Sequence, residues 1–270
     1  MKKVYGMLGV LLLVSALLVG PAAAEMYIEA YLGGTAAGNM SNNQTVAIPG
    51  DGSAVGRFPG QAALSVLPGL KVGYWFVPTG FLGYNYPDWM KYFGVFTDFS
   101  YQRMDIMEKG FGVRASSFLL TPSNTQFLNG YFKTEGTVVT WAFMLSGRYG
   151  FLPDSEVPFG RLQPYVAVGP AIFFSTQEAK LVLKNINMNR ALLGGSAMGS
   201  QGSINIGLAV ECGLRYMCLK NVSLDASFKY RYARPSFKYT WQDLAGLTAT
   251  TTLKPEYDLF SGQLGVAYHF

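Results

Sequence analysis

The stretch that decides the fold is SGQLGVAYHF, residues 261–270. Side chains on a β-strand point to opposite faces with period two. One face of this stretch is apolar, so as a strand it must meet either a protein core or lipid, and the other face is small or polar. The apolar face holds Leu264, Val266, Tyr268 and Phe270, and the other holds Ser261, Gln263, Gly265, Ala267 and His269.

The same alternation recurs along the chain. Its clearest example is VSLDASFKYRYAR at 222–234, and the weakest includes Pro164 and Pro170, which cannot donate to a β-ladder. Eight such runs are present, and each is predicted to form a strand. They cover residues 26–34, 64–76, 92–103, 136–149, 162–175, 204–216, 222–234 and 257–270.

The segments between these runs alternate between long and short. The long ones cover 35–63, 104–135, 176–203 and 234–256, and this alternation is typical of bacterial outer-membrane barrels. The first is expected to be a mobile surface loop. In the second, Asn129-Gly130 is a hairpin signal, so this segment either extends its strands or adds a hairpin that raises the strand count to ten. The fourth is expected to be an extended hairpin with its tip near 243–246.

Composition separates a membrane barrel from a soluble sandwich. Half of the residues are hydrophobic, 15% are aromatic and only 14% are charged. The polar faces of the runs are mostly Gly, Ala and Ser, whereas a soluble sandwich needs charged outer faces. Aromatic residues also gather near both ends of the runs, as in the girdles of membrane barrels. The predicted fold is all-β: an eight-stranded antiparallel up-and-down transmembrane β-barrel, closed by pairing of the last strand with the first.

The N-terminus has the pattern of a secretory signal peptide. A basic MKK precedes an apolar stretch and the small residues PAAA, which predicts cleavage after Ala24; the alternative is an uncleaved membrane helix. The predicted domains are therefore a signal peptide at 1–24 and a barrel at 25–270 with four long extracellular loops and both ends on the periplasmic side. Cys212 and Cys218 lie about 20 Å apart along extended chain, too far for a disulfide, so both are predicted to be reduced.

Three segments carry a family resemblance: NVSLDASFKYRY at 221–232, LQPYVAVGPAIFF at 162–174 and LFSGQLGVAYHF at 259–270. They resemble the small eight-stranded outer-membrane barrels of the OmpA-transmembrane and opacity-protein type. The resemblance implies location in the bacterial outer membrane and a C-terminal aromatic signal, here Phe270 with Tyr268 and Val266, read by the barrel-assembly machinery. The peptidoglycan-binding domain that follows the barrel in OmpA is not expected here.

Because side chains alternate between the two faces of a strand, a set of ionisable side chains is expected on the inward faces of the barrel strands. An eight-stranded barrel is just wide enough to be filled by its own side chains, and buried charges persist only when paired. A structural ion-pair network is therefore favoured over the alternative, a gated polar pathway. The predicted network is Glu29, Lys71, Asp98, Arg148, Glu211, Arg215, Asp225, Lys229 and Arg231, and His269 is expected at the periplasmic rim.

The predicted function is a structural or surface-interaction role without catalysis; the alternative is a small pore for small solutes. A serine nucleophile needs a nearby base, and the chain has one histidine, His269. No cofactor or metal is expected. Without Lys2 and Lys3, 19 basic residues stand against 16 acidic ones, and this net charge of +3 is too small to favour nucleic acid. A monomer in contact with outer-membrane lipid is expected. Arg103 and Arg234 lie at the outer rim, which suggests contact with lipopolysaccharide phosphates.

Overall fold

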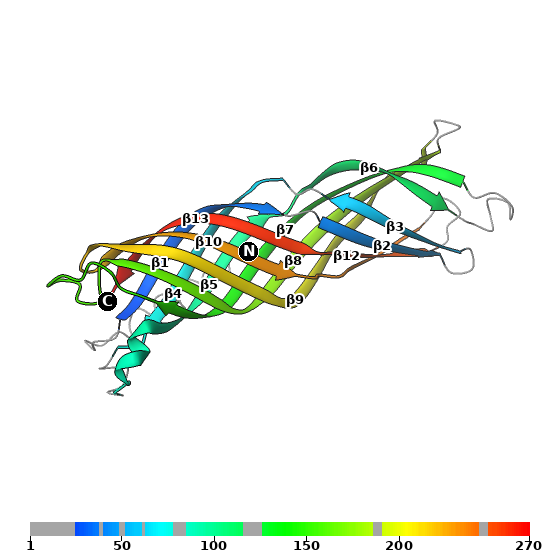
Figure 1. Cartoon of the computed structure of the whole chain (residues 1–270). Helices are drawn as coiled ribbons and strands as arrows, with labels where there is room; N and C mark the ends of the chain where they lie inside the picture. The colour runs from blue at the N-terminus through cyan, green and yellow to red at the C-terminus, as the bar shows by residue number, and fades with distance from the viewer. Residues whose placement is uncertain are drawn as a thin grey trace, which may run out of the picture.

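The computed structural model describes residues 25–37, 40–48, 52–60, 63–77, 85–115, 126–185, 191–242 and 248–270. The expected signal peptide and the tip at 243–246 lie outside them. Eight strands wind round one axis to form an elongated barrel (Figure 1). These are β1 Glu25–Ala37, β4 Ser65–Trp75, β5 Phe93–Arg103, β7 Gln126–Arg148, β8 Leu162–Asn185, β9 Ala191–Leu219, β10 Val222–Ala233 and β13 Tyr257–His269.

Every strand of the barrel pairs antiparallel with its neighbours in the order β5-β4-β1-β13-β10-β9-β8-β7, and β5 pairs with β7 to close the ring. The first and last strands pair from Tyr27 opposite His269 to Ala37 opposite Leu259. Closure leaves no open edge, which a bilayer could not hydrogen-bond. The predicted eight-stranded up-and-down barrel is confirmed, and the ten-stranded alternative is wrong.

Four connections lie at one end of the barrel, here called the loop end, and they contain further strands: β2 Met40–Ile48, β3 Gly52–Gly60, β6 Ile106–Ala115, β11 Phe237–Gln242 and β12 Thr248–Pro255. β11, β12, β2 and β3 form a second sheet. The first connection is therefore a paired hairpin and not an irregular loop. Asn129 and Gly130 pair with Gly112 and Phe111 in the middle of the β6–β7 ladder. Reading Asn129-Gly130 as a turn was wrong, because continued pairing overrides a two-residue turn preference.

The opposite end, here called the turn end, carries the other three connections. β9 and β10 are joined through a hairpin in which Leu219 pairs with Val222. The β4–β5 connection contains a 3-10 helix, η2 Asp88–Tyr92. The β7–β8 connection turns at Gly160, whose φ of +122° suits glycine because a side chain there would strain the backbone.

The prolines of β8 sit where its pairing is asymmetric. Pro164 and Pro170 both remain in register with β9, opposite Leu214 and Leu208. On the β7 side, the ladder runs from Ala142–Ala171 to Leu145–Val168 without pairs at Gly169 and Pro170. The missing N–H of proline thus costs a ladder bond on one side only.

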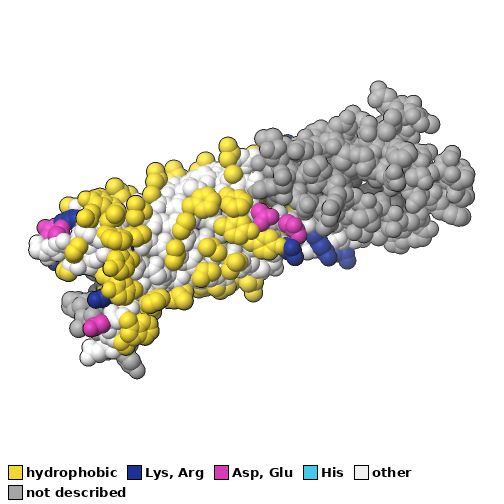
Figure 2. Space-filling model, viewed as in Figure 1, with side chains coloured by type: hydrophobic (Ala, Val, Ile, Leu, Met, Phe, Trp, Pro, Cys, Tyr) yellow, Lys and Arg dark blue, Asp and Glu magenta, His cyan; other side chains and the backbone are white. Residues whose placement is uncertain are grey.

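The outer surface of the barrel is a belt of apolar side chains. Figure 2 shows these side chains over the barrel wall, with charged side chains toward the two ends of the belt on the face in view. Toward the loop end, the belt stops at a hydrogen bond of 2.7 Å between Thr137 and Thr176, and beyond it Lys133 pairs with Glu135 at 2.7 Å. From this boundary to the turn end, β7 keeps about the 9–11 residues needed to cross a bilayer. Among the described residues, no helix is long and apolar enough to do so.

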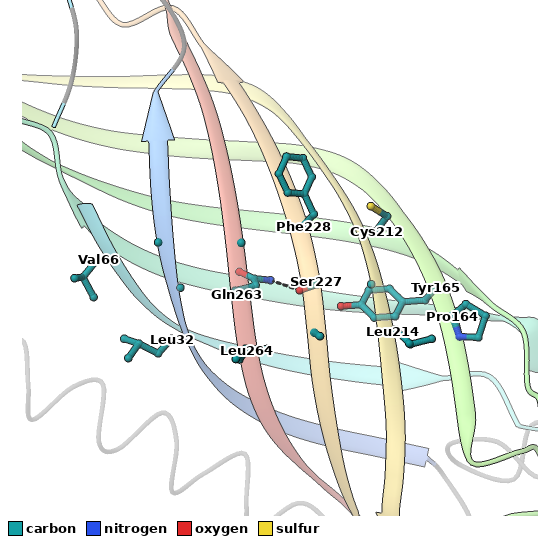
Figure 3. A pocket seen from close by; sticks show the side chains of 15 residues that line it. Leu32, Val66, Pro164, Tyr165, Cys212, Leu214, Ser227, Phe228, Gln263 and Leu264 are labelled. Carbon is teal, nitrogen blue, oxygen red and sulfur yellow. Dashed lines mark hydrogen bonds between the residues drawn. The ribbon is translucent and has the colours of Figure 1, made fainter. Parts of the chain in front are cut away.

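One shallow groove interrupts the belt. On its outer side, Gly34 and Gly262 leave space with no heavy atom within 4 Å of a built Cβ. Figure 3 shows Leu32, Val66 and Leu264 on its flank, whereas Gln263 hydrogen-bonds Ser227 at 2.7 Å behind the wall. Cys212 also lines the groove, and neither Cys212 nor Cys218 forms a disulfide, as predicted.

Inside the barrel, tyrosine rings pack on glycines of the neighbouring strand. A Cβ on Gly69 would lie 2.2 Å from the Tyr31 ring, and one on Gly73 would lie 2.3 Å from the Tyr27 ring. Gly213 and Tyr165 form a third such pair. The small residues on the inward faces therefore leave room for large rings. Sequence reasoning missed these rings, because it treated the small residues alone as the filling of a narrow bore.

Candidate functional site

The candidate site is a set of charged side chains inside the barrel. Six strands contribute one to three each, because every second residue of a strand points inward. Seven of them, here called the charge chain, alternate in sign and touch in sequence. They are Asp225, Arg215, Glu29, Lys71, Glu211, Lys229 and Asp98.

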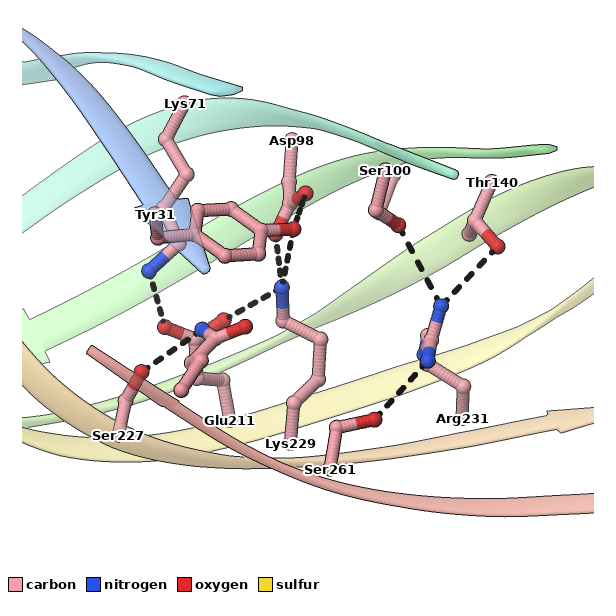
Figure 4. Close-up of polar contacts among 12 residues, drawn as sticks. Tyr31, Lys71, Asp98, Ser100, Thr140, Glu211, Ser227, Lys229, Arg231 and Ser261 are labelled. Atoms are coloured by element: carbon pink, nitrogen blue, oxygen red, sulfur yellow. Dashed lines mark hydrogen bonds and ion pairs between the residues drawn. The ribbon is translucent and has the colours of Figure 1, made fainter. Parts of the chain in front are cut away.

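Lys71 occupies the middle of the charge chain. Its Nζ lies 2.8 Å from Glu29 Oε1 and 2.7 Å from Glu211 Oε1. Glu211 continues through Oε2 to Lys229 Nζ at 3.2 Å, and Lys229 also contacts Asp98 (Figure 4). None of these side chains is more than 3% exposed. Such burial is sustainable only because each charge meets an opposite charge.

Arg215 forms the other end of the charge chain. Its Nη2 lies 2.7 Å from Glu29 Oε2, and its Nε lies 3.3 Å from Asp225 Oδ2. The guanidinium also lies over the Tyr27 ring, 4.2 Å from its centroid. Because the planar guanidinium offers donors in several directions, one arginine can join two carboxylates from different strands.

Tyrosine hydroxyls add hydrogen bonds to the carboxylates of the charge chain. The Tyr165 hydroxyl lies 2.7 Å from Glu211 Oε1 and 2.9 Å from Asp225 Oδ1, so its one proton can be donated to either carboxylate. Tyr31 donates to Asp98 at 2.7 Å. Two of the three rings that pack on glycines therefore also bring donors to the charge chain, which lowers the cost of burying four carboxylates beside three cations.

Arg231 lies in a separate layer toward the loop end. It donates to Gln102 Oε1 at 2.7 Å and Ser261 Oγ at 2.9 Å, with longer contacts to Thr35, Ser100 and Thr140. In the described part of the chain, no carboxylate lies within ion-pair distance of it. The structure thus gives Arg231 hydroxyl and amide partners where the sequence predicted an ion pair.

An apolar layer lies beyond Arg231. Leu259 stands opposite Arg231, and Tyr257 stands opposite Ala233 in the β10–β13 ladder. Phe173, Phe237 and Tyr239 are also buried there, each at 0% exposure. Phe237 and Tyr239 belong to the fourth connection. The sequence analysis assigned inward positions only on the barrel strands, so it did not find them. Together, the charge chain, the Arg231 layer and this apolar layer fill the bore along its axis.

The model of the outer membrane protein beta-barrel domain family matches residues 9–270. The chain belongs to this family. Membership also places the protein in the bacterial outer membrane and agrees with the apolar belt on the barrel wall.

This chain is similar to several solved structures of outer-membrane proteins. OprG from Pseudomonas aeruginosa is 14% identical, with 93% of this chain and 98% of that chain covered and a TM-score of 0.54. A major outer membrane protein from Thermus thermophilus is 14% identical, covering 92% and 100%, with a TM-score of 0.47. Neisserial surface protein A is 15% identical, covering 91% and 97%, with a TM-score of 0.36. No curated protein sequence matches the chain. The likeness to OprG supports the fold alone.

At the turn end of this family barrel, Arg148 lies apart from the charge chain. Its guanidinium is 4.1 Å from the ring centroids of both Trp75 and Phe159, and it donates to Gln163 Oε1 at 3.0 Å. His269 Nε2 is 2.9 Å from Ser223 Oγ, and both side chains are buried. The network predicted as one set is therefore distributed over three levels of the barrel.

The remaining predicted residues lie on the outer surface. Val266, Tyr268 and Phe270 share the outward face of β13 and are 54%, 51% and 42% exposed. Arg103 and Arg234 are exposed near the loop end of the belt and pair with Asp105 at 3.2 Å and Glu256 at 3.1 Å. Their guanidinium groups are thus accessible to ligands, in competition with these carboxylates.

Proposed function

We propose that this outer-membrane barrel is a monomer without catalytic activity, closed to ions, that acts through surface interactions at its loop end. The observation that carries the proposal is the charge chain, in which seven side chains of alternating sign are each no more than 3% exposed. An ion crossing the bore would have to break these pairs, and removing one partner of a buried pair costs about 3–5 kcal/mol.

The His269–Ser223 contact does not favour an enzyme. A serine nucleophile must reach a substrate, and Ser223 is 0% exposed. A catalytic histidine is also oriented by a third group, whereas Nδ1 of His269 has no hydrogen-bond partner among the described residues. The pair is better suited to filling the turn end of the bore.

Planar-bilayer recording tests the closed bore. The purified barrel is expected to show no steady single-channel current, whereas a Lys71→Ala, Glu211→Ala double variant is expected to conduct, because it removes the central pair of the charge chain. Steady current through the unchanged protein would instead support the small pore for small solutes.

Surface interaction is supported by the length of the strands. β8 and β9 have 24 and 29 residues, whereas a strand needs about 9–11 to cross a bilayer. The excess stands beyond the belt at the loop end, which is predicted to be extracellular. Binding residues are commonly carried by segments that a rigid scaffold holds outside the membrane.

Arg103 and Arg234 are proposed to contact lipopolysaccharide phosphates. An Arg103→Gln, Arg234→Gln variant should retain less lipopolysaccharide on purification, most clearly at low salt, because salt screens exposed charges. Lys238→Gln is the control, since Lys238 is exposed on β11 beyond the belt. Equal retention in both variants would contradict this contact.

A further inference from the structure

A pocket at the turn end is separate from the charge chain. It has a volume of about 380 Å³ and lies between the β4–β5 and β7–β8 connections. Val77, Pro158 and the ring of Phe159 form its apolar walls, and Lys91 and Arg148 bring positive charge. Two connections that are distant in sequence thus build one half-open pocket.

The pocket is cationic. No carboxylate is among its lining residues. Asp154 and Glu156 on the β7–β8 connection pair with Arg161, and Asp88 lies in the first turn of η2, outside the lining. In the described residues, Lys91 has no carboxylate within ion-pair distance; its Nζ lies 5.4 Å from the centroid of the Tyr92 ring. The positive charge of Lys91, with no acid among the described lining residues of the pocket, favours an anionic ligand.

Aromatic rings hold the Arg148 guanidinium in place. Arg148 is stacked between Trp75 and Phe159, and Tyr92 stacks on Tyr149 with centroids 5.8 Å apart and an interplanar angle of 7°. Stacking fixes a guanidinium in advance, so binding an anion costs less side-chain ordering.

The pocket lies at the level of the membrane surface. Tyr149, one of its lining residues, belongs to the outward aromatic residues at the turn end of the belt and is 55% exposed. On η2, Trp89 is 61% exposed next to Lys91 and packs on Phe93 with centroids 5.9 Å apart. Tryptophan, tyrosine and lysine together are typical of the headgroup region of a bilayer.

We propose that this pocket binds the phosphate of an anionic phospholipid headgroup. Lys91 supplies a flexible ammonium and Arg148 a planar guanidinium, a pair suited to a phosphodiester. The apolar walls receive the glycerol side of the headgroup, and the acyl chains continue along the apolar belt past Tyr149. Basic pockets near the membrane surface of other proteins bind anionic lipids by the same chemistry.

Native mass spectrometry of the whole chain in detergent tests the proposal, with phosphatidylglycerol, phosphatidylcholine and inorganic phosphate as separate probes. Wild-type protein should bind phosphatidylglycerol more tightly than phosphatidylcholine. Lys91→Gln should weaken phosphatidylglycerol binding about tenfold, as expected for one charge-assisted contact, and Lys91→Arg should restore it. Lys220→Gln is the matched control, because Lys220 is exposed at the same end but outside the pocket.

The outcomes separate the sources of phosphate. Displacement of the lipid by inorganic phosphate at similar concentration would support a phosphate site that also takes free phosphate, and its absence would assign the site to the headgroup. Equal losses in Lys91→Gln and Lys220→Gln, or equal affinity for the two lipids, would overturn the proposal, because either result would indicate diffuse attraction or none. Migration of the unheated protein in gels checks that each variant is folded.

Discussion

Arg215 joins two carboxylates across the lumen, so its pairing can be tested in a mutant cycle. Arg215→Ala should lower the free energy of unfolding by about 3–5 kcal/mol, because Asp225 then stays buried without its cation. The Arg215→Ala, Asp225→Ala double variant should unfold at a higher urea concentration than Arg215→Ala alone. Urea unfolding in lipid vesicles, followed by tryptophan fluorescence, measures both.

The control for this cycle is Arg103→Ala. Arg103 pairs with Asp105 but is 66% exposed, so its loss should change stability by no more than about 1 kcal/mol. If the costs of the Arg215 and Asp225 substitutions simply add, the two residues do not stabilise each other and the charge chain is not held by pairing.

Gly69 is an inward residue with no room for a side chain. Gly69→Ala should lower stability by about 1–3 kcal/mol, the usual cost of overpacking, because the new Cβ would meet the Tyr31 ring at 2.2 Å. Gly262→Ala is the matched control, since its Cβ would face open space on the outer wall. Urea midpoints compare the two variants. Equal midpoints would show that Tyr31 moves aside freely.

At the scale of elements, the β7–β8 connection is organised by Asp154. Its Oδ1 accepts hydrogen bonds from the backbone N–H of Val157 at 2.7 Å and of Glu156 at 3.0 Å, and Oδ2 contacts Arg161. The Val157 hydrogen bond, followed by the Arg161 contact, lowers the pKa of Asp154 below its ordinary value. These contacts favour the charged carboxylate.

The pH dependence of this turn follows from that direction. Because the folded pKa is depressed, the stabilisation is fully present above the unfolded pKa of about 3.9 and is lost as the pH falls through the folded pKa. A carboxyl NMR titration in nanodiscs should therefore give a midpoint below about 3.9 for Asp154. In Asp154→Asn, the amide resonance of Val157 should lose its acid transition. A midpoint above 3.9 would contradict the observed contacts.

At the scale of the whole molecule, the apolar belt predicts which sites meet hydrocarbon. After Cys212 and Cys218 are replaced by serine, fluorophores on Leu208→Cys and Phe228→Cys should be quenched by brominated lipid, because both side chains are on the outer wall and more than 40% exposed. A fluorophore on Lys254→Cys should not be quenched, since β12 belongs to the loop-end sheet. Equal quenching at all three sites would contradict the assignment of the apolar belt as the part of the wall that contacts hydrocarbon.

The sequence by itself determined the eight barrel strands and the inward or outward direction of their side chains. Both depend on the period of two, which is a local property of extended backbone and is visible in runs such as 222–234. It also indicated that the inside of the barrel is charged and the outside apolar, because an outer face in contact with lipid must be apolar, whereas one in contact with water is polar. Pairing of the last strand with the first was also predicted, because lipid cannot hydrogen-bond an open sheet edge.

Only the tertiary structure decided which residues meet. Arg215 reaches Glu29, 186 positions away, and this contact depends on strand stagger round the ring, which no local pattern contains. The same stagger puts Tyr31 on Gly69 and leaves Arg231 among hydroxyls. The long connections became paired strands because neighbouring ladders continue beyond the belt, and backbone pairing between distant segments outweighs short turn signals. The turn-end pocket likewise exists only where two distant connections come together.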